Sequence, residues 1–392
     1  MTVLAFDAYV QDWLNLILRW LHVIAAIAWI GTSFYFVLLD QSLRPAKREL
    51  DRDEGVGGEL WEVHGGGFYR VQKFTVAPRT LPDHLAWFKW EAYATWLSGF
   101  ALMLVLFYLD AGSTLVGPAG LGASWTVAIS LVLLAAAWVA YDVLNRSTGD
   151  GRIIWPVLGV LAAVSAWGSS ELFTPRGAWL QVGAMIGTVM SANVFFNIIP
   201  AHWELIRARE AGREPDPAPG IQAKQRSVHN NYLTLPVLLV MLAGHFTFLT
   251  GHDQAWLALV ALMALGAWAR LFFNLRHRGR THWWMLLAGA AALVLLAVAF
   301  RPPAAASEPA PAALVEQGEA VFATAGCVAC HTLAAVGAAG VVGPNLDALQ
   351  PDAARVTRAV TSGIGGMPAF TDQLTAAEID AVAAYVSTIT KE

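Results

Sequence analysis

The chain has 392 residues, of which 56% are hydrophobic and only 14% are charged. Soluble domains carry about 25% charged residues, so this composition excludes an ordinary soluble globular protein. The net charge of -4 gives no electrostatic support for nucleic-acid binding. Both cysteines lie in one motif, which argues against a disulfide framework or a zinc cluster. The N-terminal residues lack the basic segment of a cleavable signal peptide, so export is expected to depend on membrane-spanning segments.

Before residue 300, apolar segments recur that are close to the ~20 residues a helix needs to cross a bilayer. A lone strand could not satisfy its backbone hydrogen bonds there, so each segment is predicted to be helical. The expected fold class is therefore all-α, with a polytopic bundle of about eight transmembrane helices over residues 1–300. The segments are 13–39, 84–109, 122–143, 153–171, 178–200, 230–250, 254–273 and 281–300.

Basic residues predict the orientation of this bundle. Most lie in two long connections, 40–83 and 201–229, whereas the opposite side has little beyond Arg176 and Arg301. Positive residues mark the cytoplasmic side of a membrane, so both termini are expected to face outward. The basic residues of the two connections are Arg44, Lys47, Arg48, Arg52, Arg70, Lys73, Arg79, Arg207, Arg209, Arg213, Lys224 and Arg226.

The C-terminal part of the chain contains Cys327-Val-Ala-Cys330-His331, a C-x-x-C-H haem-attachment motif. Two thiols at this spacing can each add to a haem vinyl group, and His331 then becomes the proximal iron ligand. Met367 is expected to be the sixth ligand, which raises the haem potential and suits one-electron transfer. The sequence therefore predicts one covalent haem c.

A Pro/Ala linker at residues 301–313 is predicted to connect the bundle to this module. Residues 314–392 then form a small class I cytochrome c domain, whose last helix starts with a capping box at Thr375 and Glu378. Covalent haem attachment takes place on the outer side of a bacterial cytoplasmic membrane. That requirement and the charge bias place the domain on the same, periplasmic side of an inner membrane.

Two histidines inside predicted spans are candidates for a second cofactor, because ionisable groups are costly within a membrane. His22 and His245 lie at similar depth on separate helices and could ligate the iron of a haem b, or another metal, within the bundle. Arg19, one turn from His22, could pair with a haem propionate. The alternative is that each histidine only forms a hydrogen bond to a neighbouring helix.

A second polar group lies toward the cytoplasmic side. His84, Trp87 and Glu91 are expected to share a face at the start of the second span, and Asn193 and Asn197 lie one turn apart in the fifth. The sixth span opens with a cluster that could bind a flat, polar heterocycle through in-plane hydrogen bonds and aromatic stacking. Its residues are Arg226, His229, Asn230, Asn231 and Tyr232. An interfacial belt of polar and aromatic side chains is the alternative.

Three strings together resemble the membrane-bound, cytochrome c-linked urate oxidases (urate hydroxylases) of bacteria: RSVHNNYLTLPVLLVML, GTVMSANVFFNIIPAHWE and CVACH. The resemblance covers both the bundle and the cytochrome domain. It differs at the end of the sixth span, where Gly244 stands before His245 in place of the family's usual Asn. The resemblance implies oxidation of urate to 5-hydroxyisourate, with electrons passed to a cytochrome c and no direct peroxide production.

On this reading, Arg226, Asn230, Asn231 and Tyr232 bind urate, and His229 or Glu91 removes a proton from a urate N–H. Electrons leave through haem c to a respiratory oxidase or a soluble cytochrome c. One haem c accepts a single electron at a time, so a second redox centre or two turnovers of the cytochrome are needed. Two other hypotheses remain: a non-enzymatic membrane anchor for the cytochrome, or a quinol-oxidising subunit of a respiratory complex.

Overall fold

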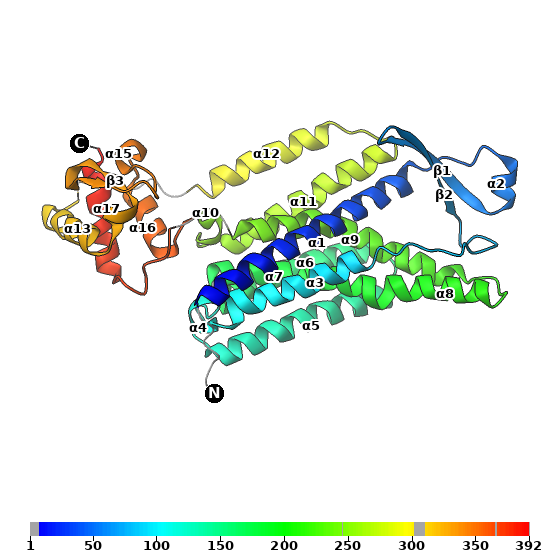
Figure 1. Cartoon of the computed structure of the whole chain (residues 1–392), viewed down its shortest axis with the longest axis horizontal. Coiled ribbons are helices and arrows are strands. Elements are labelled where there is room, and N and C mark those ends of the chain that lie inside the picture. The colour runs from blue at the N-terminus through cyan, green and yellow to red at the C-terminus, as the bar shows by residue number, and fades with distance from the viewer. Residues whose placement is uncertain (1–7, 245, 302–309, 365–366, 392) are drawn as a thin grey trace. The chain divides into compact units, whose positions relative to one another are not determined.

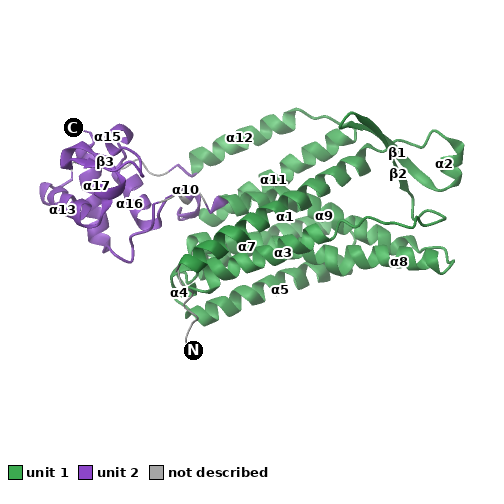
Figure 2. Cartoon of the chain, in the orientation of Figure 1, with its two compact units in different colours: residues 1–242, 254–299 green, residues 243–253, 300–392 purple. Residues whose placement is uncertain are grey.

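The computed structural model describes residues 8–244, 246–301, 310–364 and 367–391. The chain divides into two compact units (Figures 1 and 2). The first unit comprises Met1–Leu242 and Gln254–Ala299, and the second comprises Ala243–Asp253 and Phe300–Glu392. Most of the predicted linker at 301–313, like His245, lies outside the described residues, so the linker boundaries remain a prediction.

The first unit is a bundle of long helices. Two of them contain a π-helical segment, and the second of these, η2, is followed directly by a further α-helix. The elements are α1 (Ala8–Ser42), α3 (Trp90–Met103) with η1 (Leu104–Tyr108), α4 (Ala111–Thr114), α5 (Ala123–Ser147), α6 (Gly151–Leu172), α7 (Pro175–Asn193) with η2 (Val194–Ile198) and α8 (Ile199–Glu210), α9 (Pro217–Ala243), α11 (Ala255–His277) and α12 (Trp284–Ala299).

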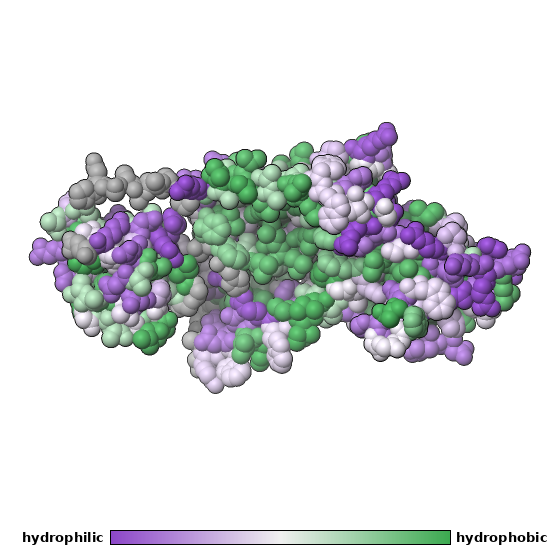
Figure 3. All heavy atoms as spheres, turned by 90° about the horizontal axis from the view of Figure 1, so that it is seen from above, coloured by the Kyte–Doolittle hydropathy of each residue, from purple (hydrophilic) through white to green (hydrophobic). Residues whose placement is uncertain are grey.

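The helices of the first unit expose a large apolar surface (Figure 3). Trp20 of α1 is 68% exposed and Leu287 of α12 is 73% exposed, which in water would be strongly unfavourable. Within the described residues, 6 helices are long and apolar enough to cross a membrane, and α12 is a shorter apolar helix. The predicted all-α membrane bundle with a C-terminal cytochrome-like unit is therefore confirmed, with an approximate number of spans.

Several predicted boundaries are wrong, among them the end of the sixth span, because α9 ends at Ala243 and not at residue 250. The second span does not begin at 84, because residues 84–89 are not helical and α3 starts at Trp90. The supposed loop 201–229 is largely helical, since α7 continues through η2 into α8 and α9 starts at Pro217. Polar residues prolong a helix beyond a membrane, where water satisfies their side chains, and a proline is well tolerated in the first turn. Hydropathy marks the apolar part of a helix and misses such extensions.

Side-chain hydrogen bonds connect the helices inside the bundle. Gln181 of α7 exchanges hydrogen bonds with Ser130 of α5, which also bonds the hydroxyl of Tyr108 at 2.7 Å. Trp96 of α3 donates to Thr188 of α7 at 3.1 Å. Inside a membrane, apolar side chains pack against lipid about as favourably as against another helix. Hydrogen bonds between helices therefore contribute to their association there.

The connection between α1 and α3 forms a small folded cap. It contains α2 (Glu49–Asp53) and the antiparallel hairpin of β1 (Val56–His64) and β2 (Gly67–Phe74). The side chain of Arg70 forms ion pairs with Asp51 and, at 2.5 Å, with Glu59. Asp40 at the end of α1 accepts from Lys73 of the hairpin and from Lys224 of α9, which ties the cap to both helices. Several of the basic residues predicted to be cytoplasmic therefore have fixed partners.

The second unit is a small helical module with its own core. Its elements are α13 (Ala312–Thr324), α14 (Cys327–Cys330), β3 (Thr332–Leu333), η3 (Ala334–Val336), β4 (Ala338–Ala339), α15 (Leu346–Leu349), α16 (Ala353–Ser362) and α17 (Ala376–Ile389), and the unit also includes the single turn α10 (Thr247–Thr250). Phe322 of α13 packs against Tyr385 of α17, and both are buried with Leu333 in this core. The module thus has a hydrophobic core of its own.

The predicted capping box at the start of α17 is present. The backbone N–H of Thr375 donates to Glu378 at 2.8 Å, and the backbone N–H of Glu378 donates to the Thr375 hydroxyl at 3.3 Å. The hydrogen bonds from the Thr375 backbone and hydroxyl lower the pKa of Glu378. Stabilisation by this carboxylate is therefore complete above its ordinary pKa and is lost as the pH falls through the lower pKa of the folded state.

Replacing Thr375 by alanine is expected to destabilise α17 by about 1 kcal/mol near neutral pH, as for other N-cap residues. Hydrogen exchange of the α17 amides in the full-length protein, corrected for intrinsic rates, measures the effect as a loss of protection. The difference from wild type should shrink as the pH falls through the pKa of Glu378. Thr324→Ala, which alters an exposed helical threonine, is the control. A difference that does not change with pH would contradict the role of Glu378.

Candidate active site and haem pocket

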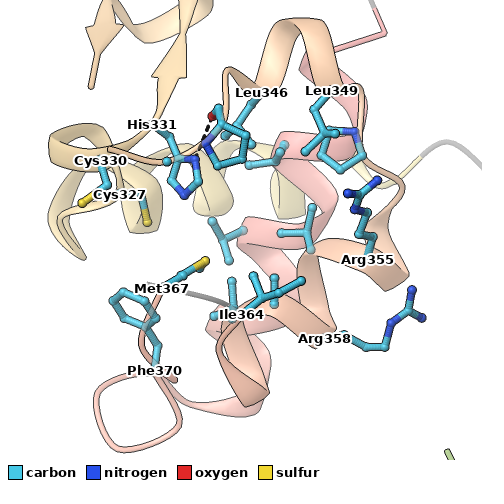
Figure 4. A pocket seen from close by; sticks show the side chains of 18 of the residues that line it. Cys327, Cys330, His331, Leu346, Leu349, Arg355, Arg358, Ile364, Met367 and Phe370 are labelled. Carbon is cyan, nitrogen blue, oxygen red and sulfur yellow. Dashed lines mark hydrogen bonds between the residues drawn. The ribbon is translucent and has the colours of Figure 1, made fainter. Parts of the chain in front are cut away.

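A cavity of about 630 Å³ lies in the second unit beside the C-x-x-C-H motif. Figure 4 shows His331 and Met367 pointing into it from opposite sides, with Cys327 and Cys330 along its wall. The remaining lining is mostly apolar, including Leu346. All four haem-binding residues predicted from the sequence are thus brought to one cavity.

The position of His331 is set by the segment that follows the motif. Its Nδ1 atom donates to the backbone carbonyl of Pro344 at 3.0 Å, which leaves Nε2 free to bind iron (Figure 4). A Cβ atom on Gly343 would lie 2.5 Å from the imidazole, so only glycine allows the Pro344 carbonyl to approach the ring this closely. The Gly-Pro pair therefore orients the ring for iron binding.

Met367 is held by a short backbone bridge. Its N–H donates to the carbonyl of Ile364 at 2.9 Å, and its carbonyl accepts from the N–H of Ile364 at 3.1 Å. Gly363 has a φ of +68°, and a Cβ atom there would lie 2.7 Å from the Met367 carbonyl. The donor set, the ring orientation and the apolar cavity together fit a covalent haem c with histidine and methionine ligands.

In the bundle, a buried hydrogen-bond network joins three helices. His229 of α9 bonds through Nδ1 to the hydroxyl of Tyr141 on α5, at 2.8 Å. Asn193 of α7 donates to that hydroxyl at 3.1 Å and to Oδ1 of Asn230 at 2.9 Å. Asn230 in turn donates to the backbone carbonyl of Met190 at 2.9 Å. Tyr141, Asn193, His229 and Asn230 are each at least nine-tenths buried.

The proton positions in this network can be assigned from one end. The Met190 carbonyl can only accept, so it faces the amide nitrogen of Asn230, whose Oδ1 must then accept from Asn193. Asn193 donates one N–H to Asn230 and the other to Tyr141, and its Oδ1 has no partner in the described chain. A buried acceptor without a partner is costly, which favours a ligand or water at this point.

Two further unpaired donors lie on the same helices. Nδ2 of Asn197, one turn beyond Asn193 within the π-helical segment η2, has no partner among the described residues, and neither has Nη1 of Arg226. Pro200 has no N–H to donate to residue 196, and this is one reason why the helix is irregular here. Short π-helical segments occur frequently at functional sites.

The cluster predicted at the start of the sixth span does not face one pocket. Successive residues of a helix are rotated by about 100°, so His229 and Asn231 point in nearly opposite directions, whereas His229 and Tyr232 lie on the same side and both contact Trp155. His229 and Asn230 face α5 and α7, whereas Asn231 accepts a hydrogen bond from Arg270 of α11. Tyr232 packs edge-to-face against Trp155 of α6, with ring centroids 5.2 Å apart. The string is therefore divided between two polar regions.

Arg226 already has a partner. It donates to Asp142 at 2.8 Å, both side chains are largely buried, and its guanidinium lies 5.0 Å from the centre of the Tyr141 ring. Glu91 on α3 has one buried oxygen, Oε2, without a partner. No hydrogen bond or ion pair among the described residues joins Glu91 to the His229 network, so the two base candidates are not part of one network.

Sequence reasoning missed four residues of these regions: Tyr141, Asp142, Trp155 and Arg270. The first three lie in segments that read as ordinary spans, and only the tertiary contacts reveal them. Arg270 could have been found from the sequence, because it is the one charged residue in the predicted span 254–273. In the structure its residue is 4% exposed. Intramembrane charges are functional candidates by default.

Of the proposed second haem site, only part can be described. His22 donates from Nδ1 to the carbonyl of Thr95 at 3.0 Å, and its ring lies against Gly99, where a Cβ atom would be 2.8 Å away. This leaves Nε2 for a metal or another partner. Arg19 donates to Asn15 at 2.9 Å. His245 lies outside the described residues, so ligation of a haem b by the two histidines remains a prediction.

Comparison with known proteins identifies both parts of the chain. Residues 8–301 match the family model "Urate oxidase N-terminal", and residues 313–386 match "Cytochrome C oxidase, cbb3-type, subunit III". Among solved structures, the c-type cytochrome SorU from Sinorhizobium meliloti is 51% identical over 20% of this chain and 94% of its own, with a TM-score of 0.20. A search of curated proteins finds no match.

The first match spans most of the chain, and the second covers the module that contains the haem pocket. Together they describe an oxidoreductase related to urate that uses a cytochrome for electron transfer. The chain belongs to the urate oxidase N-terminal family, with a c-type cytochrome domain fused to its membrane bundle.

Proposed function

We propose that this protein is a membrane-bound urate oxidase that converts urate to 5-hydroxyisourate and delivers the electrons to its own cytochrome domain. One observation carries the proposal: a chain of the urate oxidase N-terminal family also contains a cavity that fits haem c. Addition of water to urate and removal of two electrons and two protons gives 5-hydroxyisourate. No peroxide is formed, since oxygen is not the direct acceptor.

The unpaired atoms around the His229 network suit a purine. Oδ1 of Asn193 can accept an N–H, while Nδ2 of Asn197 and Nη1 of Arg226 can donate to carbonyl oxygens. Urate has both kinds of group in one plane. Trp138 stacks on Phe196 with an interplanar angle of 21°, which adds a flat aromatic surface beside Tyr141. We expect urate to bind among these side chains.

His229 is the preferred base. For this role Nδ1 carries the proton and donates to the Tyr141 oxygen, which leaves the Nε2 lone pair to accept a proton from a urate N–H. Tyr141 then donates its own hydroxyl proton to the substrate, because its oxygen already accepts from Asn193 and His229. Tyr141 thus sets the tautomer of the imidazole. Glu91, with its unpaired Oε2, is the second candidate.

Cys327, Cys330, His331 and Met367 would hold haem c. Haem c, when bound, supplies a one-electron acceptor at a potential raised by its methionine ligand. The protein's own residues orient and surround the haem site: the Pro344 carbonyl accepts a hydrogen bond from His331, and most of the cavity lining is apolar. A respiratory oxidase or a soluble cytochrome c would be the next acceptor.

The proposed location is a bacterial inner membrane, with lipid around the bundle and the cytochrome domain on the periplasmic side. The concentration of basic residues near the β1–β2 hairpin and the ends of α8 and α11 supports a cytoplasmic orientation for that end of the bundle. Haem attachment outside the cytoplasm agrees with this arrangement.

Anaerobic addition of urate to the purified full-length protein is expected to reduce the c-type absorbance band, with 5-hydroxyisourate as the product. Stopped-flow spectroscopy and mass spectrometry measure the two events. Replacing both cysteines, Cys327→Ser together with Cys330→Ser, removes both points of covalent attachment and should abolish the spectral change. Reduction by a quinol but not by urate would favour the quinol-oxidising alternative, and reduction by neither would favour a membrane anchor for the cytochrome.

A pyridine haemochrome spectrum is expected to show haem b in addition to haem c if His22 and His245 ligate a second centre. His22→Ala should then remove the haem b signal and leave haem c intact. Asn15→Ala, which removes the partner of Arg19 and leaves both histidines in place, is the control. A wild-type spectrum of haem c alone would eliminate the haem b proposal.

Tyr141→Phe is expected to slow urate-dependent haem reduction by about 10-fold or more, because the imidazole of His229 loses the group that sets its tautomer. His229→Ala should lower the rate further, by roughly 100-fold to 10,000-fold, the usual contribution of a general base. The matched control is Tyr108→Phe, which removes another buried hydroxyl hydrogen bond in the bundle. Unchanged reduction by His229→Ala would rule out His229 as the base.

A further inference from the structure

Arg270 is a buried cation without a counter-charge. It lies on α11, seven residues before the helix ends at His277, and its residue is 4% exposed. Among the described residues no carboxylate forms an ion pair with it, whereas Arg226, the other buried arginine near this region, is paired with Asp142. A charge taken out of water without a partner is strongly destabilising, so a negative ligand at Arg270 would relieve a large cost.

The guanidinium is nevertheless held in a defined position. Its Nε atom donates to Oδ1 of Asn231 on α9, and its Cζ atom lies over the ring of Phe34 on α1, 4.0 Å from the ring centre. Nη2 is buried and has no partner in the described chain. Stacking and one hydrogen bond thus fix the group from two sides and leave one donor edge available.

The same face of α11 carries two more unpaired polar atoms. Asn274 and His277 follow Arg270 at intervals of four and three residues, which places all three side chains on one stripe of the helix. Oδ1 of Asn274 and Nδ1 of His277 are buried without partners in the described chain. Arg270 and Asn274 could bond to each other at this spacing, but they do not. The stripe therefore offers a charged donor beside an acceptor.

We propose that Arg270, positioned by Asn231 and Phe34, binds the negative charge of a planar heterocyclic anion, and that Asn274 accepts one of its N–H groups. This inference rests on the proposed function, in which the ligand is the urate anion. Asn231 and His229 are two positions apart on α9 and therefore lie about 200° apart around the helix axis, so the Arg270 subsite is a second urate-binding position, in the polar region next to α11. Arg226, neutralised by Asp142, has a smaller electrostatic role than the sequence suggested.

The test is binding of radiolabelled urate to the full-length protein, kept reduced so that no turnover occurs, by equilibrium dialysis. Arg270→Ala is expected to weaken binding by roughly 10-fold to 100-fold, the usual effect of losing a hydrogen bond to a charged group. Arg270→Lys keeps the positive charge but loses the planar guanidinium with its several N–H donors. It should therefore bind urate more tightly than Arg270→Ala and less tightly than wild type. Arg176→Ala, an exposed arginine in the first turn of α7, is the control.

Charge selectivity separates a ligand-binding role from a merely structural one. Wild type should prefer urate over xanthine under mildly acidic conditions, where xanthine is uncharged, and Arg270→Ala should lose that preference. Equal weakening for both purines, or unchanged affinity for urate, would overturn the inference.

The proposed function and this inference fail in different ways. Wild type that oxidises urate while Arg270→Ala keeps its affinity would refute only the role of Arg270. Wild type that neither binds nor oxidises urate, but is stabilised against heat by benzoate in an Arg270-dependent manner, would refute the urate proposal and leave the anion subsite standing. Absence of any anion effect would refute the subsite as well.

Discussion

Inside a bilayer, no water is available to satisfy a polar group, and this constraint governs the whole of the larger unit. The backbone meets it by forming helices, and the side chains meet it by bonding across helices, as Gln181 and Ser130 do. Under such a constraint a buried polar atom without a partner is informative. The unpaired atoms of Asn193, Asn197, Arg270 and Asn274 are therefore the strongest physical evidence for where a ligand binds.

The two polar regions of the bundle are linked through α9. His229 and Asn230 contact α5 and α7, while Asn231 contacts Arg270 of α11. One stretch of helix thus contributes an acid–base group to one polar region and the partner of a charged group to the other. The two roles need different surroundings, because a base needs a hydrogen-bond partner that fixes its tautomer and leaves one lone pair free, whereas a charge partner needs an unpaired donor facing the ligand.

In the cytochrome unit, hydrogen bonds hold individual side chains in position beside the haem cavity. Its two proposed haem ligands, His331 and Met367, come from segments 36 residues apart in sequence, and each is held by backbone hydrogen bonds that require glycine nearby. The motif determines where haem is attached, but the Gly343–Pro344 and Gly363 positions determine how the axial ligands point. Under the proposed function, this unit supplies an electron acceptor on the same chain.

The sequence by itself determined the all-α membrane class, the haem c motif and the family, because these depend on composition, local spacing and characteristic strings. It could not determine which side chains meet. His229 and Asn231 look like one cluster when read along the chain, yet the 100° rotation per residue sends them to different helices. Hydropathy also could not locate the helix ends, since the first turns of helices such as α9 are polar. Only the tertiary structure pairs Arg226 with Asp142 and leaves Arg270 uncompensated, because long-range packing decides which buried charge finds a partner.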